Sequence, residues 1–273
     1  MAPTLNIVGA GHVGRVLGRL FAATGSFQVQ DVLTRSPDSA RAAIDFIGAG
    51  NAAEMTALRP AAVWMLAVGD DQIASVCAQL GSALQGAVVF HCSGAKSSQE
   101  LWAASAVGAL VASVHPVRSF ADPAAVAQDF NGTFCGVEGD AAALAQLAPA
   151  LDAIGARVVV IDAAAKTVYH AAAVFASNYL VTVVDAALRA YQAAGIPADV
   201  ARELARPLAT ETLANVFRLG PEAALSGPIA RGDMQTVARQ QQAVDSWDPP
   251  TGALYAALVD ATTALAVRKH GAI

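Results

Sequence analysis

Residues 4–14, Thr-Leu-Asn-Ile-Val-Gly-Ala-Gly-His-Val-Gly, decide the fold. A short apolar run leads into Gly9, Gly11 and Gly14, which fit the pattern G-x-G-x-x-G, and a helical pattern over residues 13–23 follows. In this pattern the first glycine makes a tight turn, the second lets the backbone approach a pyrophosphate, and the third allows close helix–strand packing. The stretch therefore predicts a strand–turn–helix unit that binds a dinucleotide at the helix N-terminus.

Further short apolar runs alternate with helical patterns as far as Asp162, which is typical of βαβ units and a parallel sheet. No strand pattern is visible after Asp162; the helical patterns there include one long stretch over 164–194 and one over 198–219, with Pro207 as a kink or break. We predict an α/β protein with a Rossmann-type, doubly wound, mostly parallel sheet in residues 1–162 and an all-helical domain in residues 163–273. The strand candidates are residues 4–8, 29–34, 61–68, 87–90, 110–114 and 157–161.

The end of the second strand indicates which dinucleotide is bound. A carboxylate that reads a ribose 2′-hydroxyl is expected about 20 residues beyond the glycine motif. That position holds Thr34, followed by Arg35 and Ser36, while Asp31 falls within the strand. A guanidinium beside a hydroxyl suits a 2′-phosphate, so we predict NADP. The residues expected to hold the cofactor are Gly9, Gly11, His12, Val13, Gly14, Thr34, Arg35, Ser36, Val68 and Ser93.

The composition excludes several classes of protein. Of the 273 residues 55% are hydrophobic, but much of this is alanine, and no uninterrupted apolar run of the roughly 20 residues needed for a membrane span is present. A net charge of −5 argues against nucleic-acid binding. Three widely spaced cysteines argue against a disulfide framework, and no signal peptide is visible. We expect a cytoplasmic protein.

Polar residues that could carry chemistry follow the strands or lie on the long helix. His91, Cys92 and His115 match no zinc spacing, so no metal site is predicted. Lysine occurs three times against fourteen arginines, which draws attention to Lys166 at the head of the long helix. A lysine can donate a proton to a carbonyl oxygen as hydride arrives. Helical spacing places Lys166, His170, Val174, Ser177 and Asn178 on one side of the predicted helix.

The chain resembles the 6-phosphogluconate dehydrogenase-like superfamily, which includes β-hydroxyacid dehydrogenases, ketopantoate reductases, pyrroline-carboxylate reductases and prephenate dehydrogenases. More closely, it resembles the Rossmann-like NADP oxidoreductases (coenzyme F420-dependent-like) that carry a C-terminal helical domain of unknown function. Besides the glycine motif, the matching stretches are His-Cys-Ser-Gly at 91–94, His-Pro-Val-Arg-Ser-Phe at 115–120, residues 169–178 and residues 227–233.

This resemblance implies roles for several residues. A catalytic lysine, as in β-hydroxyacid dehydrogenases, corresponds to Lys166; the asparagine that follows it in that family does not correspond by position, because His170 stands there and Asn178 lies two turns further on. The His-Pro pair of prephenate dehydrogenases makes His115 a second candidate for proton transfer. The predicted catalytic residues are therefore Lys166, His170, Asn178 and His115.

These observations predict an NADP-dependent oxidoreductase that reduces a carbonyl or imine of a small anionic metabolite, with ketopantoate as a reasonable first substrate. Two alternatives stay open: a non-catalytic NADP-binding sensor and a prephenate-dehydrogenase-like enzyme. Because alanine-rich helices bury little surface alone, we also expect a homodimer formed through the helical domain, with no nucleic-acid or membrane partner.

Overall fold

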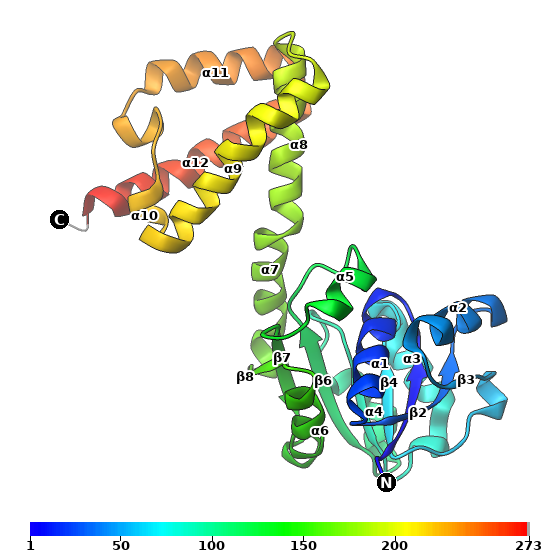
Figure 1. Ribbon diagram of the computed structural model, residues 1–273. Coiled ribbons are helices and arrows are strands. Elements are labelled where there is room, and N and C mark those ends of the chain that lie inside the picture. Colours follow the sequence, from blue (N-terminus) through cyan, green and yellow to red (C-terminus); the bar gives the residue numbers. More distant parts are fainter. Residues whose placement is uncertain (272–273) are drawn as a thin grey trace. The chain divides into compact units, whose positions relative to one another are not determined.

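The computed structural model describes residues 1–271 and consists of two compact units (Figure 1). The first unit is Met1–Phe175 and the second begins at Ala176. The boundary predicted at residue 162 lies before helix α7 (Lys166–Ala176), whereas the units divide at its C-terminal end. Helix α7 stays with the first unit because its side chains are bonded to the sheet, as described below.

The first unit is built on one eight-stranded sheet with the strand order β3-β2-β1-β4-β5-β6-β7-β8. All neighbouring strands are parallel except β6 and β7, which confirms the predicted Rossmann-type sheet. Strands β3 and β7 were not predicted; in β7, two glycines and a glutamate interrupt the apolar pattern. The strands are β1 (Thr4–Val8), β2 (Gln28–Leu33), β3 (Asn51–Ala52), β4 (Val63–Leu66), β5 (Val88–His91), β6 (Leu110–Pro116), β7 (Phe134–Gly139) and β8 (Arg157–Val160).

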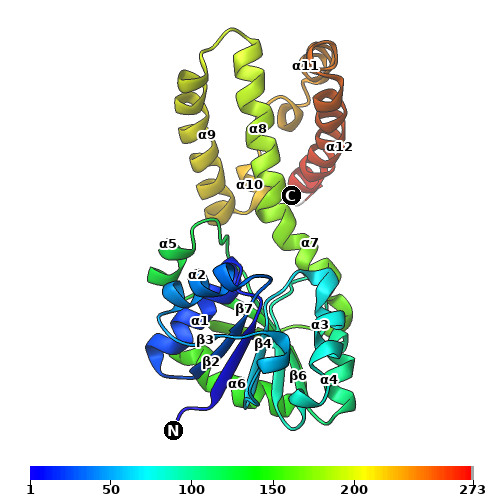
Figure 2. The same ribbon diagram turned by 90° about the vertical axis from the view of Figure 1, so that its right-hand side faces the viewer.

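Side chains alternate between the two faces of the sheet and form a core on each. Met65 packs in one core, with residues of α1, α2, α5 and α6, whereas its neighbours Trp64 and Leu66 pack in the other, with α3 and α4. Figure 2 shows α1 and α2 on the opposite side of the sheet from α3 and α4. The helices of this unit, besides α7, are α1 (His12–Thr24), α2 (Pro37–Ile47), α3 (Ile73–Leu80), α4 (Trp102–Ala106), α5 (Pro123–Gln128) and α6 (Ala141–Ala153).

The second unit is helical, as predicted. The helix expected over residues 164–194 is divided at Ser177, whose φ of −127° and ψ of −75° are not helical. The helix α9 runs through Pro207 without ending there. The carboxylate of Asp233 caps α11 by accepting a hydrogen bond from the Thr236 amide. The helices are α8 (Asn178–Ala193), α9 (Ala198–Leu219), α10 (Pro221–Ala224), α11 (Met234–Trp247) and α12 (Pro249–Gly271).

Two stretches, Ala163–Ala193 and Pro249–Lys269, are long and apolar enough to cross a membrane by length and composition. This is weak evidence for a span, because core helices of soluble proteins pass the same test. The first stretch is also interrupted by the break at Ser177.

Candidate functional site

The glycine turn between β1 and α1 has the geometry that a bound pyrophosphate needs. Gly9 has φ +85°, and a Cβ there would lie 2.6 Å from the Ala67 carbonyl oxygen. A Cβ on Gly14 would lie 2.4 Å from the Gly9 carbonyl oxygen, whereas a Cβ on Gly11 would meet nothing within 4 Å. The first and third glycines are therefore required by close packing, and the second faces open space at the N-terminus of α1.

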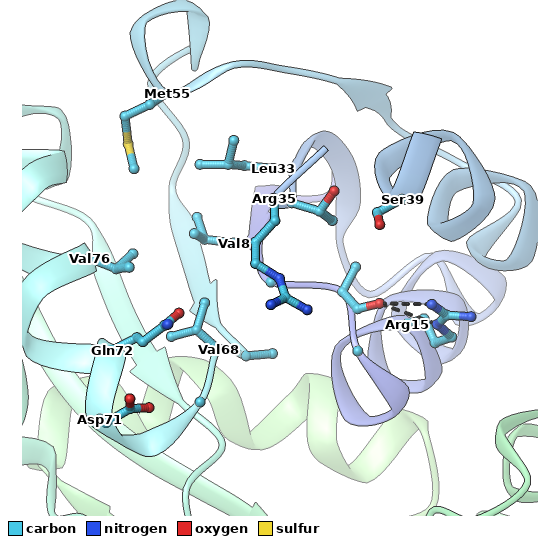
Figure 3. A pocket seen from close by; sticks show the side chains of 16 residues that line it. Val8, Arg15, Leu33, Arg35, Ser39, Met55, Val68, Asp71, Gln72 and Val76 are labelled. Carbon is cyan, nitrogen blue, oxygen red and sulfur yellow. Dashed lines mark hydrogen bonds between the residues drawn. The ribbon is translucent and has the colours of Figure 1, made fainter. Parts of the chain in front are cut away.

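A groove of about 600 Å³ runs from this turn past the ends of β1, β2 and β4 (Figure 3). Gly9, Gly11, Thr34, Arg35 and Val68, all predicted to hold the cofactor, line it. In Figure 3 the Arg35 side chain extends into the groove, and within residues 1–271 no carboxylate forms an ion pair with it. The groove is also lined by Asp71 and by five residues that were not singled out in the sequence: Arg15, Ser39, Met55, Gln72 and Val76.

The end of β2 carries no free carboxylate. Asp31 is buried and accepts hydrogen bonds from the Nε, Nη2 and backbone amide of Arg59. Burial raises the pKa of Asp31, but the hydrogen bonds from Arg59 outweigh it and hold the pKa below its ordinary value. The Ser36 hydroxyl accepts the Ser39 amide as the N-cap of α2, so Ser36 supports the loop while Ser39 lines the groove.

A second cavity, of about 410 Å³, adjoins the groove and shares Gly11, Ala67, Val68 and Gly69 with it. It lies at the carboxyl ends of β1, β4, β5 and β6, where parallel sheets bind ligands. The other residues that line it are His12, Val13, Asp70, Cys92, Ser93, Gly94, His115, Pro116, Arg118, Phe120 and His170.

Two imidazoles line this cavity, and a phenol contacts one of them. The Nδ1 of His115 lies 2.9 Å from the Tyr169 hydroxyl, and the His115 and His170 ring centres are 5.8 Å apart. A Cβ on Gly94 would lie 2.4 Å from Cδ2 of His170, and a Cβ on Gly136 would lie 2.3 Å from the Tyr169 hydroxyl. Glycine at both positions therefore makes room for the three rings.

The pKa of His115 is lowered to about 4. Burial is the main cause, and electrostatic interactions with His170 and Lys166 add to it. His115 is therefore neutral near pH 7. Burial also raises the pKa of Cys92, which lines the cavity, to about 12. Its thiol is therefore protonated near pH 7 and is not the reactive thiolate form.

Lys166 does not reach either cavity. Its side chain is 1% exposed, and its Nζ donates hydrogen bonds to the Ser113 hydroxyl and, at 3.0 Å, to Oε1 of Glu138. Glu138 in turn accepts the Ser98 amide at 2.8 Å and the Ser98 hydroxyl at 2.7 Å. The Lys166 ammonium, the Ser98 amide and the Ser98 hydroxyl all donate to the carboxylate, which is the pattern of an ionised pair.

The structure brings together only some of the predicted catalytic residues. His115 and His170 share a cavity, and Lys166 lies buried nearby in the same unit. Asn178 begins α8 in the second unit, and the break at Ser177 removes the helical register on which a common face from Lys166 to Asn178 depended. Tyr169, Glu138 and Arg118 were missed; a sequence signal existed for Tyr169 and Arg118, which lie inside the stretches that carry the family resemblance.

His91 has a structural task. Its Nδ1 accepts the Ser93 amide at 3.1 Å, which leaves Nε2 to donate to the Ser97 carbonyl at 3.0 Å. It thereby holds the loop that places Ser93 and Gly94 at the cavity. Among the residues that the structure describes, no group of His, Cys, Asp or Glu side chains is arranged to hold a metal ion.

Comparison with known families matches residues 3–116 to a Rossmann-like domain and residues 133–262 to DUF2520, a domain of unknown function. The chain pairs a Rossmann-like domain with a DUF2520 domain. This confirms the resemblance drawn from the sequence motifs. The DUF2520 match begins at the start of β7, so it includes the Glu138 strand and α7 as well as the helical unit.

Several solved structures are similar over almost the whole chain. Protein TM1727 from Thermotoga maritima is 29% identical, with 98% of this chain and 100% of that chain covered and a TM-score of 0.76. The candidate NADP oxidoreductase BF3122 from Bacteroides fragilis is 20% identical, with 96% and 98% covered and a TM-score of 0.76. The imine reductase from Myxococcus stipitatus, in complex with NADP+, is 17% identical, with 99% and 95% covered and a TM-score of 0.66. No match was found among curated proteins.

Proposed function

We propose that this DUF2520 protein is an NADP-dependent oxidoreductase that reduces the C=O or C=N bond of a small anionic metabolite. The observation that carries the proposal is the junction of the two cavities at Gly11, Ala67, Val68 and Gly69. A dinucleotide whose phosphates rest on the glycine turn would lie in the groove at one end. At its other end it would reach the second cavity, named the imidazole cavity after His115 and His170, which line it. The NADP+ complex of the similar imine reductase supports this assignment.

The residues present fit NADP better than NAD. The open side of Gly11 and the N-terminus of α1 would receive the pyrophosphate, and Arg35, with the Ser39 hydroxyl, would receive the 2′-phosphate. Asp31 is unavailable for a ribose hydroxyl because Arg59 occupies its oxygens. When bound, the reduced dinucleotide supplies the hydride.

We propose that His115, rather than Lys166, donates the hydrogen bond that the reacting double bond receives. The Tyr169 hydroxyl can donate to Nδ1 of His115, which leaves the proton of the neutral ring on Nε2. A neutral N–H donor stabilises negative charge that develops on the substrate oxygen or nitrogen. His170 lines the same cavity and is the second group that can exchange protons there, whereas the buried Lys166 does not line it.

The anionic character of the substrate is supported by Arg118, which lines the imidazole cavity. Its guanidinium is held by hydrogen bonds to Oδ2 of Asp129 at 2.9 Å and to the Thr133 hydroxyl at 3.3 Å, so it is fixed before a ligand arrives. A fixed guanidinium on the wall of a reaction cavity is suited to a carboxylate. Ketopantoate, other 2-keto acids and cyclic imino acids are the first substrates to test.

The test is NADPH oxidation against a panel of 2-keto acids and cyclic imines over a range of pH, with a His115→Gln variant and, as the control, a Gln85→Ala variant at an exposed position that lines neither cavity. We expect turnover with at least one anionic substrate and a loss of about 10²-fold or more in His115→Gln. Tight NADPH binding without turnover of any substrate would favour the alternative of a cofactor sensor. Unchanged turnover in His115→Gln would refute the role given to that residue.

We also propose that a second copy of this chain covers the helical unit. Among its described residues, the buried apolar side chains are Ala201, Ala205, Val237 and Ala266, which form too small a core for a stable unit. Large apolar side chains are exposed instead; Phe217 is 86% exposed and Val181 is 69% exposed. Large apolar side chains left exposed beside so small a core support an interface.

Equilibrium sedimentation tests the dimer, and we expect a species of twice the 27.7 kDa chain mass. Phe217→Glu and Val181→Glu should weaken the dimer, while a charge at an exposed polar position such as Gln242→Glu should not. A monomer that instead partitions into lipid vesicles would contradict both the dimer and the cytoplasmic location that we propose.

A further inference from the structure

The buried ion pair between Lys166 and Glu138 takes no part in the reaction proposed above. It nevertheless lies next to His115 and His170, on the same helix and strands. Lys166 is the first residue of α7, and Tyr169 and His170 follow it by three and four positions, so all three lie on one side of the helix. The pair therefore bears on how these two rings are held.

The sheet below α7 repeats this spacing. In the antiparallel pairing of β6 and β7, Ser113 lies opposite Glu138 and His115 lies opposite Gly136. These are alternate pairs on the same strands, so their side chains emerge on the same face. Lys166 is bonded to the first pair, and Tyr169 lies over the second, bonded to His115 and in contact with Gly136. One turn of helix α7 thus spans two successive pairs of the sheet.

We propose that the Lys166–Glu138 ion pair is a positioning device that fixes α7 against β6 and β7 and keeps His115 as a neutral, Nε2-protonated hydrogen-bond donor. The proposal rests on the function assigned to His115 above. Lys166 is a positioning residue, because it acts through Tyr169 and His115.

Two physical effects follow from the arrangement. The bonds from Lys166 to both strands prevent α7 from sliding, which keeps the Tyr169 hydroxyl 2.9 Å from Nδ1 of His115. The ammonium group, buried on the same side of the sheet, also opposes a second positive charge on the His115 ring. The other titratable or charged groups around His115 are Tyr169 and His170 on α7, Asp70 after β4, Cys92 after β5, and His12 and Arg118 on the cavity wall.

The experiment is a pH titration of ¹⁵N-labelled full-length protein by long-range ¹H–¹⁵N NMR, which reports the charge and the tautomer of each of the five histidines. A His115→Gln variant assigns the His115 signals. In the wild-type protein we expect His115 to carry its proton on Nε2 and to titrate with a pKa of about 4. A wild-type His115 that titrates near its ordinary pKa of about 6.5, or that carries its proton on Nδ1, would overturn the proposal without any variant.

Two double variants remove the charges without leaving one partner buried alone: Lys166→Met/Glu138→Leu, which is apolar, and Lys166→Gln/Glu138→Gln, which retains hydrogen bonding. In a folded double variant we expect the His115 pKa to rise and its tautomers to become mixed. A folded double variant with an unchanged His115 pKa and tautomer would show that the pair only stabilises the fold. A Lys96→Met/Glu100→Leu variant serves as the matched control, because it removes the partly exposed pair between the short 3-10 helix η4 (Ser98–Leu101) and the loop before it.

These readings need neither substrate nor cofactor. Expected NMR behaviour together with an absence of NADPH turnover would therefore contradict the proposed function and leave the positioning role of the ion pair intact.

Discussion

In the dinucleotide groove each group expected to bind the cofactor lies within one short stretch of sequence, whereas the ring cluster at the imidazole cavity is assembled from four separate segments. The turn at Gly9–Gly14 and the β2 end at Thr34–Ser39 each act through their own backbone. The cavity needs Gly94 after β5, His115 on β6, Gly136 on β7, and Tyr169 on α7. Ligand binding in the groove should therefore change when one local group is replaced. The arrangement of rings at the cavity depends on how several strands and a helix pack together. Substitutions in the two regions should therefore differ in what they change.

The largest expected effect is a loss of stability when the buried Lys166–Glu138 ion pair near the imidazole cavity is broken. Lys166→Met leaves the Glu138 carboxylate buried without its cation, and we expect the free energy of unfolding to fall by about 3–5 kcal/mol. Lys166→Met/Glu138→Leu should cost less than Lys166→Met, because both desolvated charges are removed, and its remaining cost should come from the Ser98 amide and hydroxyl, which lose their acceptor. Lys96→Met, which breaks a partly exposed i,i+4 pair, should cost no more than about 1 kcal/mol. Urea denaturation measures all three, and equal losses in Lys166→Met and Lys96→Met would contradict the buried pair.

The second effect concerns the fit of α7 on the sheet. Gly136→Ala places a methyl group against the Tyr169 ring, and we expect a loss of about 1–3 kcal/mol. In a Tyr169→Leu background the same substitution should cost less, because the hydroxyl and ring atoms that it meets are gone. Thermal unfolding of the four proteins in this cycle gives the coupling. Strictly additive losses would mean that Gly136 and Tyr169 do not touch.

The third effect is confined to the groove and should leave stability unchanged. Arg35→Ala removes the guanidinium expected to bind the 2′-phosphate, and we predict about 10–100-fold weaker NADPH binding with little change for NADH. Arg41→Ala on the neighbouring helix, where Arg41 pairs with Asp38, is the control. Calorimetric titration checks both. Equal weakening by the two variants, or tighter NADH binding by the wild-type protein, would refute the NADP assignment.

The fourth effect is spread over several pH units and is therefore the smallest at any one step of pH: it is a slope of stability with pH. Burial lowers the pKa of His91 to about 4, so the unfolded chain binds this proton more tightly than the folded chain does. The stability contributed by neutral His91 is therefore complete above about pH 6.5 and is lost as the pH falls toward 4, at up to about 1.4 kcal/mol per pH unit. Urea denaturation at several pH values should show this slope in the wild-type protein and in His12→Gln, and a smaller slope in His91→Gln. A slope unchanged in His91→Gln would place its origin elsewhere.

The same contrast explains how much the sequence could predict. The glycine turn, the Arg35 end of β2 and the parallel sheet follow from local patterns, and the structure has them where they were expected. Strand β7 was missed because Gly136, Glu138 and Gly139 break its apolar alternation. Gly136 contacts Tyr169, and Glu138 is paired with Lys166. Nothing in the local sequence around β7 reveals these contacts, because the partner residues lie 28 or more positions away.

The burial of Lys166 shows the same limit. Its rarity marked it correctly as unusual, but a proton donor and a buried ion-pair partner look alike until the opposing strand is known. The helix break at Ser177 was also invisible, because the apolar pattern of residues 164–194 continues through it.

The claim that one continuous site joins the groove to the imidazole cavity can be tested directly with histidine NMR on ¹⁵N-labelled protein. We predict that NADPH shifts the ring signals of His115 and His170, and that 2′-phospho-ADP-ribose, which lacks the nicotinamide, binds without shifting them. NADPH that binds tightly and leaves both ring signals unchanged would contradict the continuous site.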